Sequence, residues 1–304
     1  MVYDVIIIGA GSAGYAAGIY ATRFGLRTLL IGKEPGGQTN EAYEVDNYPG
    51  FLNISGIDLL TKFKEHAEKL GAELVVSEAI DVGKKGENFV VKTKDKEHEG
   101  KAVILATGSK KRKLGLPNEK ELTGKGVAYC ATCDAMFFND KIVGVTGGGN
   151  SAVKSALLLA EYAKKVYLVY RREKKDMRAM PYWVKKAEEN DKIEMIFRSV
   201  PKEIKGKEKL ESVVFEKDGK DLEIKMDGLF VEIGTDPENS LAKKLGVSLD
   251  EQGKIKVEKD MSTNVEGVFA AGDITNGSNG MEQIVTSCAE GSIAAESAYN
   301  YVKK

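Results

Sequence analysis

A strongly apolar run near the start of the chain predicts a buried β-strand at residues 4–8, where valine and isoleucine follow one another without a polar break. A glycine-rich turn at residues 9–14 comes next, and an alanine-rich stretch then predicts a helix that ends near residue 24. A second apolar run at residues 28–31 predicts another strand. This order of strand, turn, helix and strand is typical of a βαβ unit, in which the two strands are parallel.

The same order occurs again in the middle of the chain. An apolar run at residues 141–146 leads into a glycine-rich turn at 147–152, a helical stretch to about residue 163 and a strand at 166–170. Two such units predict an α/β protein with two Rossmann-like, three-layer nucleotide-binding domains.

The glycines of both turns have a chemical reason. The turns read Gly9-Ala10-Gly11-Ser12-Ala13-Gly14 and Gly147-Gly148-Gly149-Asn150-Ser151-Ala152. In a dinucleotide fingerprint one glycine makes the tight turn, one lets the backbone approach a pyrophosphate, and one lets helix and strand pack closely. The helix N-terminus then offers N–H groups to the phosphates. A glycine turn without a ligand is the alternative, and the βαβ context repeated in one chain disfavours it.

Two more strand-like segments end in glycine turns, at residues 102–108 and 267–273, and a helix is expected at 284–301. A nucleotide domain that begins at residue 1 and is completed near residue 273 implies an inserted second domain. The predicted domains are therefore 1–113 with 238–304, and 114–237. Residues that break regular structure lie near both crossovers.

The residues after the second strand of each unit bear on the choice of nucleotide. In the second unit they are Tyr170, Arg171 and Arg172, with no acid to bind a ribose 2′-hydroxyl and two arginines to bind a 2′-phosphate. This favours NADPH over NADH, and a plain basic loop is the alternative. In the first unit the acid is Glu34, which lies shortly after the strand end and is a candidate for an adenosine ribose.

Composition and charge narrow the function classes. The 304 residues carry 45 basic and 46 acidic side chains, for a formal net charge of −1, so no overall field points to nucleic acid or to an anionic membrane. Neither a signal peptide nor an apolar run of membrane-spanning length is evident. Three cysteines are too few for a secreted disulfide scaffold, and the cytoplasm is the expected location.

The pair Cys130 and Cys133, spaced as CxxC, is the main candidate for chemistry. A redox dithiol at a helix start is the leading interpretation, because this spacing brings the sulfurs within bonding reach and helix N–H groups lower a thiol pKa. A zinc site would need further ligands near the pair, and no metal is expected. Inert cysteines are the third possibility. Asp134 is a candidate proton shuttle or an acid favoured by the helix dipole. Cys288 is expected to be structural.

Taken together, these motifs resemble one family over essentially the whole chain: the low-molecular-weight thioredoxin reductases of bacteria and archaea. Besides both glycine turns and Cys130-Ala131-Thr132-Cys133-Asp134, the resemblance includes Gly36-Gly37-Gln38, Asn47-Tyr48-Pro49-Gly50, Ala106-Thr107-Gly108 and Gly272-Asp273. In the larger glutathione-reductase-like enzymes the redox cysteines follow the first glycine turn, whereas here they precede the second.

The resemblance implies FAD as cofactor and NADPH as electron donor. It implies that FAD is bound by Gly9, Gly11, Ser12, Ala13, Gly14, Glu34, Gly37, Gln38, Asn47, Ala106, Thr107, Gly108, Gly272, Asp273, Gln283 and Ile284. It assigns NADPH to Gly147, Gly149, Asn150, Ser151, Ala152, Arg171, Arg172 and Arg178.

The same resemblance implies a catalytic order. Cys133 faces the flavin, Cys130 attacks the disulfide of a thioredoxin or glutaredoxin-like protein, and Asp134 acts as acid and base. The inserted domain is expected to rotate between half-reactions, and the chain is expected to form a homodimer through its flavin domains.

Several positions depart from the family pattern. Tyr170 stands where the family has histidine, Arg178 comes two residues later than its counterpart, and Glu282 replaces a basic residue beside the loop at 275–280. These departures leave open a donor other than NADPH. A flavin dithiol oxidase of the same fold and a non-catalytic flavin redox sensor are the further alternatives.

Overall fold

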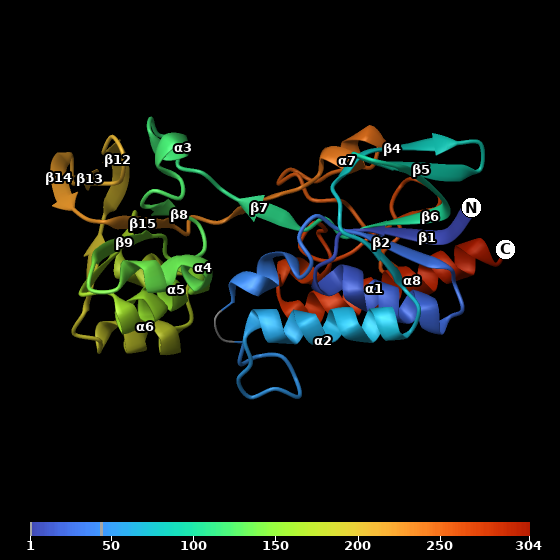
Figure 1. Cartoon of the computed structure of the whole chain (residues 1–304), viewed down its shortest axis with the longest axis horizontal. Helices are drawn as coiled ribbons and strands as arrows, with labels where there is room; N and C mark the ends of the chain where they lie inside the picture. Colours follow the sequence, from blue (N-terminus) through green and yellow to red (C-terminus); the bar gives the residue numbers. More distant parts are fainter. Residues whose placement is uncertain (1, 43–44) are drawn as a thin grey trace. The chain divides into compact units, whose positions relative to one another are not determined.

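The computed structural model describes residues 2–42 and 45–304, which form two compact units (Figure 1). One unit runs through Lys110 and resumes at Asp236, and the other spans Lys111–Thr235. The crossovers pair with each other as short strands, β7 (Ser109–Lys111) and β16 (Thr235–Pro237). The divisions therefore lie slightly earlier in the chain than the expected bounds of 113 and 237, because this pairing begins before the residues that break regular structure.

The first unit is built on a sheet in the order β3-β2-β1-β6-β5-β4, with β17 paired to β6. Its strands are β1 (Val2–Ile8), β2 (Thr28–Ile31), β3 (Glu73–Val75), β4 (Ala79–Lys85), β5 (Asn88–Thr93), β6 (Glu97–Leu105) and β17 (Val268–Ala270). Strands β1, β2, β3, β6 and β17 pair in parallel, whereas β4 and β5 form an antiparallel extension that the apolar pattern did not predict.

The helices of this unit are α1 (Ser12–Arg23), α2 (Gly56–Lys69), α7 (Ser240–Lys244) and α8 (Ile284–Val302), with 3-10 turns η1 (Gly37–Glu41) and η4 (Ser278–Gly280). In Figure 1, α1, α2 and α8 lie together on one side of β1 and β2. Val5 and Ile7 belong to the core on that side, whereas Ile6 and Ile8 belong to a second core on the opposite face. The unbroken apolar run of β1 is explained by this burial on both faces, as is typical of parallel strands.

Close packing of α1 against α8 depends on small residues. A Cβ added at Gly291 would lie 2.2 Å from the carbonyl oxygen of Ala13, so α8 approaches the first turn of α1 backbone to backbone. This contact holds the start of α1 in a fixed place.

The second unit has a parallel sheet in the order β11-β10-β9-β15-β8. Its strands are β8 (Val127–Ala128), β9 (Ile142–Thr146), β10 (Lys165–Tyr170), β11 (Ile193–Phe197) and β15 (Gly228–Val231). Its helices are α3 (Glu119–Leu122), α4 (Ala131–Asp134), α5 (Asn150–Tyr162) and α6 (Pro181–Glu188), with turns η2 (Ala135–Phe138) and η3 (Lys174–Asp176). Helices α5 and α6 share a core with Val143 and Val145 of β9.

A second sheet, β12-β13-β14, covers the other face of this unit (Ser199–Lys205, Ser212–Lys217 and Lys220–Lys225). Phe215 of β13 belongs to the same core as Leu229 and Val231 of β15. The unit is three-layered as expected, but the third layer is an antiparallel sheet rather than helices. None of the described helices is both long and apolar enough to cross a membrane.

Candidate active site

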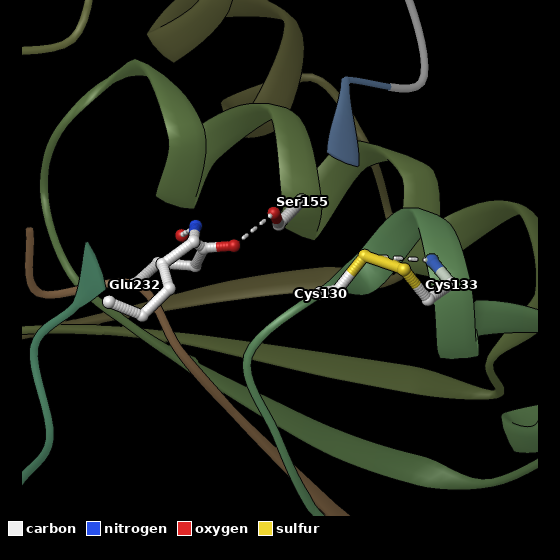
Figure 2. Close-up of a disulfide and its surroundings, with 5 residues drawn as sticks. Cys130, Cys133, Ser155 and Glu232 are labelled. Atoms are coloured by element: carbon white, nitrogen blue, oxygen red, sulfur yellow. Dashed lines mark hydrogen bonds and ion pairs between the residues drawn. A yellow bond between two sulfur atoms is a disulfide. The ribbon is translucent and has the colours of Figure 1, made fainter. Parts of the chain in front are cut away.

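Cys130 and Cys133 form a disulfide at the start of α4 (Figure 2). Cys130 is the N-cap residue, with extended backbone, and its sulfur accepts a hydrogen bond of 3.1 Å from the N–H of Cys133. Cys133 is exposed and Cys130 is half-buried. A backbone N–H directed at a sulfur stabilises its thiolate, so the same contact favours an ionised Cys130 after reduction. The disulfide agrees with the redox-dithiol interpretation, because the CxxC spacing does bring the two sulfurs within bonding reach.

Asp134 ends α4 directly after the disulfide. Burial raises the pKa of its carboxyl group above the ordinary value of 3.8. Desolvation therefore outweighs any stabilisation of the carboxylate by the helix N-terminus. A carboxyl group with a raised pKa is better suited to deliver a proton than one that is permanently ionised.

Apolar side chains beside the disulfide are exposed. The exposed fraction is 66% for Met136 and 76% for Phe137, whereas Phe138 turns inward and packs edge-on against Phe230 at a ring distance of 5.2 Å. Neither Met136 nor Phe137 was predicted from the sequence to belong to the site. The apolar run that begins after Asp134 was their only signal, and such a run is also typical of a core.

The two glycine turns have the same geometry. A Cβ at Gly9 would lie 2.0 Å from the Ala106 carbonyl oxygen, and one at Gly147 would lie 2.1 Å from that of Glu232. By contrast, a Cβ at Gly149 would meet nothing within 4 Å. The first glycine of each turn therefore packs against a neighbouring strand, and Gly149 leaves its backbone open to an approaching ligand.

Helices α1 and α5 begin at these turns without side-chain caps. Gly11 and Gly149 are the N-cap residues, both extended, and neither first turn contains an acidic residue. Uncapped N–H groups together with the positive end of the helix dipole fit a pyrophosphate.

Polar side chains expected near a flavin are brought together in the first unit. Asn47 donates to the Gln283 side-chain oxygen at 2.8 Å although the two are far apart in sequence. Gln38 donates to the Ser109 hydroxyl at 2.9 Å. Gln283 is the N-cap of α8, so Ile284 begins that helix.

Asp273 lies in the turn between β17 and α8, where Ser287 donates to its carboxylate at 3.1 Å. Burial raises the pKa of Asp273, and the nearby carboxylate of Glu282 raises it further. Glu282 itself forms an ion pair with Lys254.

Glu290 is a buried acid beside the expected site that was not predicted from the sequence. It is 4% exposed and accepts hydrogen bonds from the Gly272 N–H and the Thr275 hydroxyl, each at 2.8 Å. The carboxylate therefore holds the turn that carries Asp273. Its signal in the sequence was one of the two acids within the small-residue stretch of α8.

Of two further residues expected at the FAD site, Glu34 and Thr107, only Thr107 has a described side-chain hydrogen bond to another part of the unit. Glu34 is exposed after β2, and the described contacts do not join it to the first glycine turn. Thr107 donates to the carbonyl oxygen of Glu238 at 2.8 Å and so holds the returning chain close to Ala106 and Gly108.

The basic loop after β10 is folded back onto the second glycine turn. The Tyr170 hydroxyl donates to the carbonyl oxygen of Asp176 at 2.7 Å, and its ring lies where a Cβ on Gly148 would be. The N–H of Arg178 donates to the Gly148 carbonyl oxygen at 2.9 Å. The loop, which contains turn η3, therefore places the Arg178 backbone at the glycine turn.

The remaining arginines, Arg171 and Arg172, are exposed at the start of this loop. On its other side, the Asn150 side chain accepts from the N–H of Met180 at 2.8 Å. The loop is thus joined to the beginning of α5, which also carries Ser151 and Ala152.

Cys288 is a free thiol on α8. It is half-buried, and burial raises its pKa to about 11, so it is protonated at neutral pH. Within residues 2–42 and 45–304, the structure shows no group of three or more His, Cys, Asp or Glu side chains placed to hold a metal ion.

Comparisons with known proteins agree with this arrangement. The family described as pyridine nucleotide-disulphide oxidoreductase matches residues 3–291. A thioredoxin reductase of Bacillus subtilis (strain 168) is 43% identical over 307 aligned residues, which cover 100% of this chain and 96% of the relative. One from Peptoclostridium acidaminophilum is 44% identical, covering 99% of this chain and 98% of the relative.

Solved structures give the same result. The thioredoxin reductase of Lactococcus lactis is 39% identical, with a TM-score of 0.94 and 99% of both chains covered. That of T. acidophilum is 36% identical, with a TM-score of 0.92 and 98% of both chains covered. The chain therefore belongs to the pyridine nucleotide-disulphide oxidoreductase family, as one of its low-molecular-weight thioredoxin reductases.

Proposed function

We propose that this protein is an NADPH-dependent thioredoxin-disulfide reductase that uses FAD and the Cys130–Cys133 disulfide to reduce a thioredoxin or glutaredoxin-like protein. The observation that carries this proposal is the disulfide at the start of α4, in the same unit as the second glycine turn. FAD, when bound, supplies hydride acceptance from the nicotinamide and delivery of an electron pair to a disulfide.

The first unit is the proposed FAD site. Its uncapped α1, its glycine turn and the buried carboxyl of Asp273 fit the phosphates and the polar chain of that cofactor. We assign the pyrophosphate to the turn from Gly9 to Gly14, and the ring system to Gln38, Asn47 and Gln283. Gly37, Ala106–Gly108, Gly272 and Ile284 complete the proposed site, and Glu34 is retained as the ribose candidate.

The second unit is the proposed NADPH site. Gly147, Gly149 and the start of α5 would hold the pyrophosphate, while Arg171, Arg172 and Arg178 would pair with the 2′-phosphate. Three guanidinium groups on one loop suit a phosphate better than a ribose hydroxyl. Tyr170 supports this site by fixing the loop through Asp176.

The cysteines are proposed to divide the disulfide chemistry. An electron pair delivered to Cys133 breaks the Cys130–Cys133 bond. Uptake of one proton then gives one thiol and one thiolate. The Cys130 thiolate attacks the partner disulfide and expels one partner thiolate. Cys133 then attacks Cys130, which re-forms the intramolecular disulfide and releases the second partner thiolate. Asp134 is the proposed proton donor and acceptor for these steps.

The partner surface includes Met136 and Phe137, which lie exposed next to the disulfide. An apolar surface beside a reactive sulfur suits transient docking of another protein. Rotation of the second unit about the β7 and β16 crossovers would let the disulfide and the nicotinamide reach the flavin in turn. We also propose that the chain forms a homodimer through its first unit, the proposed FAD site.

Anaerobic stopped-flow measurements on the flavin-loaded protein test the proposal. NADPH should bleach the flavin absorbance much faster than NADH does, and Cys133→Ser should abolish thioredoxin reduction while leaving the bleaching intact. Failure of both nucleotides to bleach the flavin would refute the NADPH assignment. Oxygen uptake with small dithiols in the absence of nucleotide would instead identify a dithiol oxidase.

A further inference from the structure

Glu232 is a buried carboxylate at the point where the strand order of the second sheet reverses. From β9 the chain passes through α5 to β10 on one side, whereas β15 lies on the other side of β9. Dinucleotides bind across the carboxyl ends of parallel strands at such a point. Glu232 directly follows β15, and its N–H donates to the carbonyl oxygen of Thr146 at 2.9 Å.

The same backbone position exists in the first unit, where it carries a different side chain. There the N–H of Ala106 donates to the carbonyl oxygen of Ile8 at 2.8 Å, and Gly9 packs on Ala106 as Gly147 packs on Glu232. The two copies of the turn are therefore alike in backbone. They differ in that one has a methyl group and the other a carboxylate.

A second position changes together with the first. Ala17 and Ser155 each occupy the sixth place in the helix that follows the glycine turn. Ala17 is fully buried and apolar, whereas the Ser155 hydroxyl donates to Glu232 at 3.1 Å. Figure 2 shows the Ser155 and Glu232 side chains pointing toward one another. An apolar pair in one copy thus corresponds to a hydrogen-bonded polar pair in the other.

Lys111 completes this cluster from the crossover strand β7. Its ammonium group lies 2.9 Å from the Glu232 carboxylate, and the exposed fractions of the two side chains are 19% and 5%. A buried ion pair adds little stability over apolar residues of the same size, so stability alone does not account for it. A carboxylate accepts about four hydrogen bonds, so these two contacts leave capacity for another donor.

We propose that Glu232 is a specificity-determining residue that accepts a hydrogen bond from the carboxamide amino group of the nicotinamide. Ser155 and Lys111 orient the Glu232 carboxylate. This inference rests on the proposed NADPH site. The 2′-phosphate loop lies after β10, on one side of β9, so the nicotinamide end of the dinucleotide extends to the other side, where Glu232 follows β15. The carboxamide carries two N–H donors, and a fixed carboxylate is their complement.

The experiment compares two nucleotides that differ only at this group. Calorimetry on the flavin-loaded protein measures the dissociation constants of NADP⁺ and of its 3-acetylpyridine analogue, in which a methyl group replaces the carboxamide amino group. The variants are the double substitution Lys111→Met with Glu232→Met, which leaves no charge unpaired, and Ser155→Ala, which reproduces Ala17. Glu119→Gln is the matched control, because Glu119 is another buried carboxylate of the same unit, hydrogen-bonded by Tyr129.

The wild-type protein and the control should bind NADP⁺ about tenfold or more tightly than the analogue, as a hydrogen bond to a charged acceptor implies. In the double variant the two constants should agree within about twofold, and Ser155→Ala should lower the ratio as well. A wild-type ratio retained in the double variant, or in Ser155→Ala if the double variant does not fold, would overturn the inference. Failure of the wild-type protein to bind either nucleotide would overturn the proposed function instead.

Discussion

The turn that carries Asp273 depends on one buried carboxylate, so Glu290→Ala should destabilise the first unit, the proposed FAD site, more than the loss of an exposed side chain would. Glu290 accepts from the Gly272 N–H and the Thr275 hydroxyl at 2.8 Å each. Thr275 is 2% exposed and Gly272 is buried. Truncation therefore removes both bonds: the Gly272 N–H is left without an acceptor, and the Thr275 hydroxyl keeps only its bond of 3.0 Å to the Gly272 carbonyl oxygen.

The magnitude follows from those two contacts. A hydrogen bond to a charged group contributes about 1.5–3 kcal/mol, so the pair contributes roughly 3–6 kcal/mol to the free energy of unfolding. For a unit of this size, 1 kcal/mol corresponds to about 2–4 °C in Tm. The Tm of the FAD-free protein should therefore fall by on the order of 10 °C. FAD binding should also weaken, because the turn must be reordered when the cofactor binds.

Thermal unfolding followed by circular dichroism gives the first quantity, and titration of the FAD-free protein with FAD gives the second. Glu282→Ala is the matched control from the same loop, since the Glu282 side chain is 43% exposed and its pairing with Lys254 contributes about 1 kcal/mol or less. A Glu290→Ala protein whose Tm and FAD affinity match those of Glu282→Ala would refute the reasoning.

Three further predictions concern other parts of the site. Because burial raises the pKa of Asp273, its ionisation opposes folding as pH rises above the ordinary value of 3.8; Asp273→Asn should therefore stabilise the FAD-free protein against urea at neutral pH and lose this advantage below about pH 4. Tyr170→Phe removes the bond to the basic loop and should raise KM for NADPH about fivefold at unchanged kcat, whereas Tyr167→Phe on the same strand should change neither in steady-state assays. Phe137→Ser should lower kcat/KM for thioredoxin about tenfold or more without slowing flavin bleaching by NADPH. The control is Tyr182→Ser, which removes an exposed aromatic side chain elsewhere on the unit; an equal loss of kcat/KM in that variant would contradict a docking role for Phe137.

The paired glycine turns and the CxxC show how far local sequence reaches. A tight turn, a backbone open to a phosphate and a three-residue spacing of two sulfurs depend on neighbouring residues, so they could be predicted from the order of amino acids. The same holds for β1, β9, α1, α5 and α8, whose apolar patterns run along single elements and whose positions agree with the prediction. The family resemblance followed from these local motifs.

Other features depended on contacts between residues far apart in the chain. The antiparallel sheet β12-β13-β14 was not predicted, because its apolar side chains are buried only against the parallel sheet that it covers. Tyr170 and Arg178 departed from the family pattern in sequence, and only the folded loop returned Arg178 to Gly148.

The buried acids make the division clearest. By itself, the sequence determined that two dinucleotide turns and a redox dithiol are present, because each is encoded within a few consecutive residues. Only the tertiary structure decided that Glu290 holds the Asp273 turn and that Glu232 meets Ser155 and Lys111. A carboxylate acquires such a role from the donors that folding brings to it, and those donors lie on other strands and helices.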